Sequence, residues 1–158
     1  MARYVTRVKT PLAADDAFDY VADLTNFAEW DPGVRRAVQV EGKRAEVGAA
    51  YDVTVAAVPR DLTLRYEVVE HDAPRSCLVV ARSAMFTSTD RITVVPDGDG
   101  SIVAYDAELA LNGPLGLFDP VLRLAFGRIG DRAAAGLRRA PDGEAAPARA
   151  PPRLWRPP

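Results

Sequence analysis

The sequence is poor in the residues that hold metals, form disulfides or cross membranes. Its 158 residues include one cysteine, Cys77, and one histidine, His71. One cysteine excludes an internal disulfide, and with one histidine it does not supply the usual ligands of a zinc site. No apolar run approaches the roughly 18 residues of a membrane span, and the N-terminus lacks the apolar segment of a signal peptide. We expect a cytoplasmic protein with no metal, no cofactor and no membrane span.

A large net charge is also missing. The formal net charge is −2, with 48% hydrophobic and 27% charged residues, which is an ordinary globular composition. There is therefore no electrostatic reason to expect nucleic acid as a partner. A small neutral or apolar molecule fits this composition better, and the length suits one domain.

The first 33 residues read as a strand followed by two short helices. Residues 3–8 alternate apolar and polar side chains, as a half-buried strand does. After Pro11, apolar residues recur at helical spacing up to Val21. Asp23 or Thr25 can then cap a second short helix that holds Phe27 and Trp30, before Pro32 and Gly33 turn the chain.

From residue 34 to residue 111 the pattern predicts an antiparallel meander of six strands. The strand-like runs, separated by short turn segments that include "FTST" at 86–89, are "VRRAVQV", "YDVTVAAV", "LTLRYEVVE", "SCLVVARSAM", "DRITVV" and "IVAYDAELAL". Asp119 followed by Pro120 is a helix start, and apolar spacing predicts a long amphipathic helix to residue 139. Residues 140–158, rich in Pro, Ala and Arg, predict a disordered tail after a domain of residues 1–139.

This order of elements resembles the START/Bet v 1-like superfamily, and within it the bacterial polyketide cyclase/dehydrase, or SRPBCC, proteins. The resemblance rests on "FDYVADLTNFAEWDPGV", "YEVVEHDAPRSCLVV" and "DGDGSIVAYDAELALNGPLGLFDPVLRLAFGRIG". It implies an α+β helix-grip fold, in which a curved seven-stranded antiparallel sheet wraps round the long C-terminal helix with a cavity between them. Trp30 would then be an apolar plug against the sheet and that helix.

Strand parity selects the apolar side chains expected to face the cavity. The sets on the sheet include Leu64 and Tyr66 on one strand, and Tyr105 and Leu109 on another. Small residues on the helix mean either that the sheet comes close there or that a space remains, and we expect a space of ligand size. Together with Trp30, the apolar lining expected from these elements is Leu64, Tyr66, Val80, Ile92, Tyr105, Leu109, Phe118, Leu122, Ala125 and Ile129.

The same parity gives the polar candidates. If Leu78 and Val80 face inward, Arg82 on the same strand faces inward too. Likewise, if Ile92 faces inward, Asp90 and Ser88 do so as well. A buried arginine needs a partner, which Asp90 could supply. The alternative for Arg82 and Asp90 is a register shift or bulge near the strand ends that exposes both side chains to solvent. The alternative for Tyr66 and Tyr105 is that they pack in the core and bind no ligand.

Two classes of function stay open. The first is a binding protein for a lipophilic small molecule, a lipid or a polyketide-like compound. The second is a polyketide aromatase/cyclase or dehydratase that uses the Asp, Tyr and Arg groups of the pocket. A hydrolase is disfavoured because no G-x-S-x-G motif occurs and His71 falls in an expected turn. A third class also stays open, a domain whose grip is filled and which works through its surface, because Leu117 and Leu124 on the outer face of the long helix could contact a second subunit in a homodimer.

Overall fold

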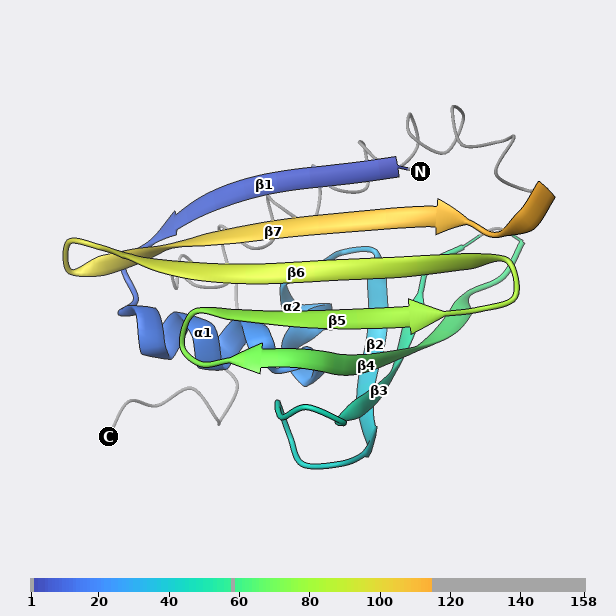
Figure 1. The fold of residues 1–158 in the computed structure, drawn as a ribbon, viewed down its shortest axis with the longest axis horizontal. Helices are drawn as coiled ribbons and strands as arrows, with labels where there is room; N and C mark the ends of the chain where they lie inside the picture. The colour runs from blue at the N-terminus through green and yellow to red at the C-terminus, as the bar shows by residue number, and fades with distance from the viewer. Residues whose placement is uncertain (1, 58, 115–158) are drawn as a thin grey trace, which may run out of the picture.

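The computed structural model describes residues 2–57 and 59–114, and within them one antiparallel sheet dominates (Figure 1). Its seven strands are β1 (Ala2–Thr10), β2 (Val34–Glu41), β3 (Ala50–Val55), β4 (Leu62–Asp72), β5 (Ser76–Arg82), β6 (Phe86–Asp97) and β7 (Gly100–Leu111). Their order across the sheet is β1-β7-β6-β5-β4-β3-β2. The meander from β2 to β7 confirms the strand count predicted from alternation.

The first strand, β1, forms one edge of the sheet and pairs with the last strand, β7. β1 pairs with β7 from Ala2 opposite Leu109 to Thr10 opposite Ser101. At the far end of this ladder the two backbones meet closely, since a Cβ added at Gly100 would lie 2.2 Å from the carbonyl oxygen of Thr10. Glycine is therefore required where β7 starts.

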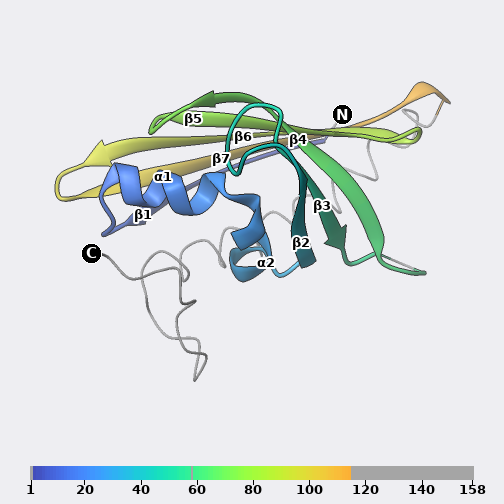
Figure 2. The same ribbon diagram turned by 90° about the horizontal axis from the view of Figure 1, so that it is seen from below.

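The helices follow β1 and lie on one face of the sheet, as Figure 2 shows. They are α1 (Ala14–Ala22), the 3₁₀ turn η1 (Leu24–Asn26) and α2 (Phe27–Trp30). The Asp23 carboxylate accepts hydrogen bonds from the backbone N–H of Thr25, at 3.0 Å, and from its hydroxyl, at 2.7 Å, and it also pairs with Arg44. This cap breaks the chain into two short helices, because it satisfies the N–H groups that a new helical turn leaves unpaired.

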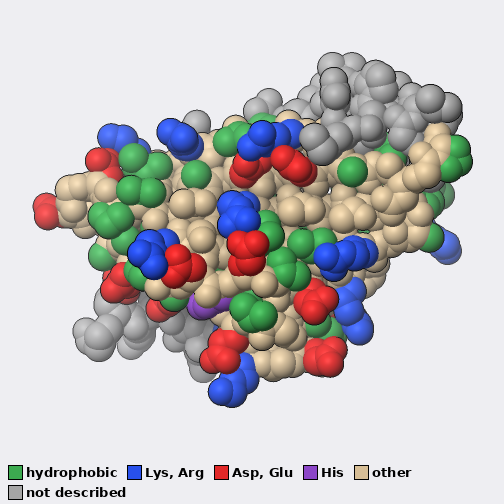
Figure 3. Space-filling view, in the orientation of Figure 1, with side chains coloured by type: hydrophobic (Ala, Val, Ile, Leu, Met, Phe, Trp, Pro, Cys, Tyr) green, Lys and Arg blue, Asp and Glu red, His purple; other side chains and the backbone are tan. Residues whose placement is uncertain are grey.

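The core lies between these helices and the sheet face that they cover. Phe18 and Val21 of α1 and Trp30 of α2 are buried, together with inward side chains such as Val53 and Val103. The opposite face meets solvent and carries the cross-strand ion pairs Arg3–Asp106, Arg65–Asp52 and Arg91–Glu70. Figure 3 shows positive and negative side chains interspersed over that face. No helix within the described residues is long and apolar enough to cross a membrane.

The structure corrects the predicted face of β5. Cys77, Val79 and Ala81 join the core, and Leu78, Val80 and Arg82 point the other way. Both sets are apolar up to Ala81, so alternation alone could not choose between them. Arg82 is exposed and makes no ion pair with Asp90.

Two further differences lie at strand ends. The segment "FTST", expected as a loop, is the start of β6, because β5 and β7 pair with it on either side. A bulge between Val68 and Glu70 shifts the register of β4, so His71 lies opposite Cys77 and its ring packs 5.3 Å from that of Phe18, instead of standing in a turn. The predicted long helix to residue 139 and the tail 140–158 lie outside the described residues.

Candidate functional site

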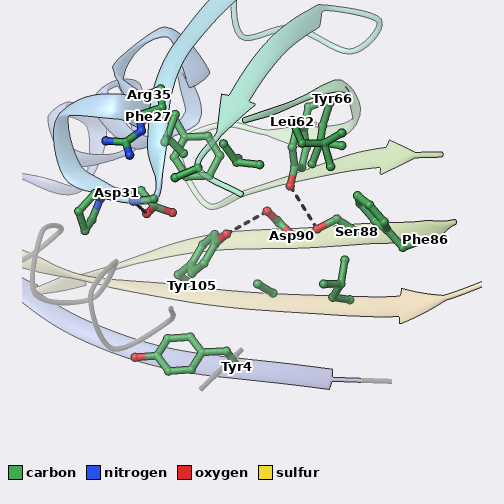
Figure 4. A pocket seen from close by; sticks show the side chains of 18 residues that line it. Tyr4, Phe27, Asp31, Arg35, Leu62, Tyr66, Phe86, Ser88, Asp90 and Tyr105 are labelled. Atoms are coloured by element: carbon green, nitrogen blue, oxygen red, sulfur yellow. Dashed lines mark hydrogen bonds between the residues drawn. The ribbon is translucent and has the colours of Figure 1, made fainter. Parts of the chain in front are cut away.

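A cavity of about 390 Å³ opens between the inner face of the sheet and the loop that follows α2. Its walls include Leu62 and Leu64 of β4, Ala107 and Leu109 of β7, and Phe27 of α2. Its volume falls within the usual range of small-molecule pockets, and mostly apolar walls with a few polar groups are typical of such sites. Figure 4 shows the lining side chains converging on this space.

The polar centre of the cavity is Asp90, in the middle of β6. The carboxylate oxygens of Asp90 accept one hydrogen bond from the hydroxyl of Ser88 and one from the hydroxyl of Tyr105, each at 2.9 Å. The Tyr66 hydroxyl donates to the Ser88 hydroxyl at 3.2 Å. We call these four residues the Asp90 cluster (Figure 4).

Sheet register explains how the Asp90 cluster assembles. In antiparallel pairing, residues that lie opposite each other point to the same face. Ser88 lies opposite Ala81, which in turn lies opposite Tyr66, so two small side chains leave room for the phenol to reach across. Asp90 lies opposite Ala107 and Tyr105 is two residues away on the same strand, a diagonal neighbour.

Burial controls the ionisation of the Asp90 cluster. Asp90 is 2% exposed, and loss of water raises the pKa of its carboxyl to about 6 despite the hydrogen bonds from Tyr105 and Ser88, which lower it. Burial, and then the negative charge of Asp90, raise the pKa of the Tyr66 and Tyr105 phenols well above the usual value. The tyrosines therefore stay protonated, while Asp90 can exchange a proton near neutral pH.

A second carboxyl, Asp31, lines the cavity from the loop after α2. Its oxygen Oδ1 accepts a hydrogen bond from the backbone N–H of Gly33 at 2.8 Å, a short-range bond that aspartate commonly makes in turns. Asp31 is 8% exposed, and burial raises its pKa although the bond from Gly33 opposes the rise. Two buried carboxyls thus share one cavity, and the charge of Asp31 adds to the rise in the pKa of Asp90.

Arg35 brings a positive charge to the mouth of the cavity. Its side chain is 61% exposed, and its Nε lies 4.0 Å from the carboxylate of Asp61. Within the described residues no group of three or more His, Cys, Asp or Glu side chains is placed to hold a metal ion. Cys77 is buried under the helices, and burial raises the pKa of its thiol to about 12, so it is not a ready nucleophile.

The structure brings together six of the side chains predicted for the pocket. Those that line the cavity are Leu64, Tyr66, Ser88, Asp90, Tyr105 and Leu109. Trp30 and Ile92 lie behind the ring of Tyr105, where they pack with Val21 and Val103 and leave no room for a ligand. Val80 and Arg82 are on the other side of β5 and do not line the cavity. Phe118, Leu122, Ala125 and Ile129 lie outside the described residues.

Sequence reasoning missed several lining residues. Tyr4 faces inward, opposite Ala107, and its place on one face of β1 with Thr6 and Val8 is visible in the alternation. Phe86 belongs to the polar segment "FTST", whose composition predicts a loop, so alternation indicates no face for it, although it is the first residue of β6 and lines the cavity. Asp31 lies in a turn, where period-two parity does not apply, and its only sequence signal is the Asp-Pro-Gly run directly after the buried Trp30.

A family model described as "polyketide cyclase / dehydrase and lipid transport" matches residues 1–140. The chain belongs to this family. The polyketide cyclase/dehydrase family assignment agrees with the seven-stranded sheet, the two short helices and the apolar cavity. It supports a role in hydrophobic ligand binding or in polyketide processing.

Solved structures show the same fold. A START superfamily protein from Mycobacterium smegmatis superposes with a TM-score of 0.74 at 14% identity, covering 89% of this chain and 97% of that one. A protein from Thermus thermophilus gives a TM-score of 0.69 at 15% identity, with 87% and 94% covered. The di-domain ARO/CYC protein BexL from the BE-7585A biosynthetic pathway gives a TM-score of 0.66 at 17% identity, and the match covers 92% of this chain and 50% of that one. No curated protein matches the sequence significantly.

Proposed function

We propose that the protein binds a lipophilic small molecule, a lipid or a polyketide-like compound, in the cavity between the sheet and the loop after α2. The observation that carries the proposal is a space of about 390 Å³ whose walls are mostly apolar and whose polar centre is a single cluster around Asp90. A ligand gains affinity from burying apolar surface against Leu62, Leu64 and Leu109, and it takes its orientation from the Asp90 cluster.

Filling the cavity tests this proposal. Ala107 lies on the inner face, opposite both Asp90 and Tyr4, so Ala107→Trp would place an indole in the space that the ligand needs. We expect 2-naphthol, a flat lipophilic probe, to raise the melting temperature of the wild type, because a ligand bound only to the folded state stabilises it. In Ala107→Trp the rise should disappear.

The matched control is Ala104→Trp, on the outer face of the same strand opposite Arg7 and Thr93. It should keep the full shift with 2-naphthol. Ala107→Leu, a smaller change, covers the case in which the indole prevents folding, and it should weaken binding without abolishing it. Unchanged binding by both Ala107 variants would refute the proposal. Native mass spectrometry of the purified protein provides a direct search for a co-purified lipophile.

A second candidate function is favoured by one observation. Asp90 has a pKa raised to about 6 and is hydrogen-bonded to Tyr105 inside the cavity, so it can take up or release a proton close to neutral pH. This is the property that an aromatase/cyclase or dehydratase needs at an enol or hydroxyl group. Arg82, which the sequence suggested as a helper, is exposed outside the cavity and cannot take part.

Separating binding from conversion tests the enzyme hypothesis. Asp90→Asn removes the exchangeable proton while keeping the size of the side chain, and Tyr105→Phe removes one hydrogen bond to it. If the protein is an enzyme, both variants should still bind a polyketide-like compound but convert it at least about 100-fold more slowly, the usual contribution of a general acid or base. Binding without any conversion by the wild type would leave ligand binding as the function.

A further inference from the structure

The hydrogen bonds of the Asp90 cluster all lead toward the Asp90 carboxylate, which accepts and does not donate. Tyr66 donates its hydroxyl proton to Ser88, Ser88 donates to Asp90, and Tyr105 donates to the other oxygen of Asp90. Each hydroxyl has one proton, and all three protons are used inside the cluster. What the cluster offers to the cavity is therefore lone pairs on the two phenol oxygens and on the carboxylate.

Asp31 adds to this excess of hydrogen-bond acceptors over donors in the cavity. Its Oδ1 accepts the N–H of Gly33, and as an ionised carboxylate it has acceptor sites only. Both carboxyls are more than nine-tenths buried, at 2% and 8% exposure, and neither has an ion-pair partner among the described residues. Of the lining residues that the structure describes, the one cation is Arg35, and it is largely exposed beside Asp61.

Resting on the proposed function, we infer that the cavity selects lipophilic ligands that bring a hydrogen-bond donor, a hydroxyl or an ammonium group, and rejects ligands whose buried end is a carboxylate or phosphate. A donor from the ligand meets the lone pairs that the cluster leaves open, whereas an acceptor finds no proton there to receive while Asp90 is ionised. An anion would also meet two negative carboxylates across a medium of low dielectric constant, where like charges repel strongly. The inference excludes fatty acids bound head-first and favours phenols, alcohols and amines.

Four naphthalene probes of nearly equal size isolate the polar group. 2-Naphthol brings a neutral donor, 2-naphthylmethylamine a cationic donor, 2-methoxynaphthalene an acceptor only, and 2-naphthoate an anion. We expect the first two to bind the wild-type protein at least about tenfold more tightly than the last two at neutral pH, since one hydrogen bond to a charged group is worth that much. Isothermal titration calorimetry or thermal shifts would measure the order, and the first two probes separate a neutral donor from a cationic one.

Asp90→Asn supplies the variant that ties the order to the cluster. Its amide can donate toward the ligand and carries no charge, so binding of 2-naphthoate should rise and binding of 2-naphthylmethylamine should fall. Asp106→Asn removes a carboxylate from the outer face of β7, where Asp106 pairs with Arg3, and should leave the order as in the wild type.

The outcomes separate this inference from the proposed function. Binding of 2-naphthoate or 2-methoxynaphthalene as tight as that of 2-naphthol would overturn the donor selectivity while leaving ligand binding intact. An order of affinities unchanged in Asp90→Asn would overturn the role of the cluster in the same way. Failure of all four probes to bind would overturn both the inference and the proposed function.

Discussion

At the scale of single residues, the unusual feature is a carboxyl group that is buried without a cation beside it among the residues that the structure describes. Asp90 is held by hydroxyl groups, Ser88 and Tyr105, and not by an arginine. Hydroxyl donors stabilise the ionised form less than a charged partner would, so burial prevails and the pKa rises to about 6. The molecule thus keeps a costly group at the centre of its cavity, and shifted pKa values of this kind are common at functional sites.

This cost should be measurable as a dependence of stability on pH. The carboxyl of Asp90 has a pKa of about 6 in the folded protein against an ordinary value of 3.8, equivalent to about 3 kcal/mol. The stabilising effect of protonation is fully present below the unfolded pKa and is lost as pH rises through about 6. Between about pH 4.5 and about pH 8 the wild type should lose about 2 kcal/mol more unfolding free energy than Asp90→Asn does.

Urea unfolding of both proteins at the two pH values provides the measurement. The comparison with Asp90→Asn cancels the carboxyls outside the cavity, such as Asp52, whose pKa Arg65 lowers. Asp99→Asn, at an exposed turn position, is the control for loss of one carboxylate. Parallel pH profiles of the wild type and Asp90→Asn would show that Asp90 has an ordinary pKa in the folded protein.

At the scale of elements, α2 is a four-residue helix whose largest buried side chain is Trp30. Trp30 is 3% exposed, with its ring 4.6 Å from that of Phe27 and edge-on to Tyr105 at 5.6 Å. Such a short helix gains little from its own hydrogen bonds, so its buried rings, Trp30 and Phe27, must hold it in place. By holding α2 in place, Trp30 and Phe27 also fix the position of the loop that carries Asp31 to the cavity.

Truncating this indole should be costly. We expect Trp30→Ala to lower the free energy of unfolding by about 3–5 kcal/mol, as other large aromatic truncations in cores do. Trp30→Phe should recover part of the loss by keeping the contact with Phe27. Denaturant titration measures both, and a loss below about 1 kcal/mol for Trp30→Ala would mean that α2 is held by other contacts.

The elements also show which predictions a single sequence supports. Alternation located the seven strands, and the Asp23 cap was visible in the sequence, because both depend on neighbouring residues. The face of β5 was assigned wrongly, since Leu78 and Val79 are equally apolar and only the neighbouring strands decide which one faces the core. The polar start of β6 resembled a loop because its pairing partners lie in other strands.

At the scale of the whole molecule, the cavity is assembled from residues far apart in the sequence. Asp31, Tyr66, Asp90 and Tyr105 come from a loop and three strands. Parity predicted the strand members Tyr66, Asp90 and Tyr105, since sheet geometry sends alternate side chains to one face. Parity could not predict that the partners of Asp90 are hydroxyl groups and not Arg82, because this depends on how three strands are arranged in the folded protein.

The pairing of β1 with β7 also sets the order of events on the ribosome. Each strand from β2 to β7 lies beside the one made just before or after it, so these hairpins can close as the chain emerges. Ala2 must wait for Leu109, and at roughly 5–20 residues per second that wait is about 5–20 s. Throughout it, Tyr4 and Val8 have no sheet to pack on. The strand synthesised first is thus the last to be paired, and a nascent chain stalled before residue 100 would display an unpaired apolar segment to the chaperones of the cell.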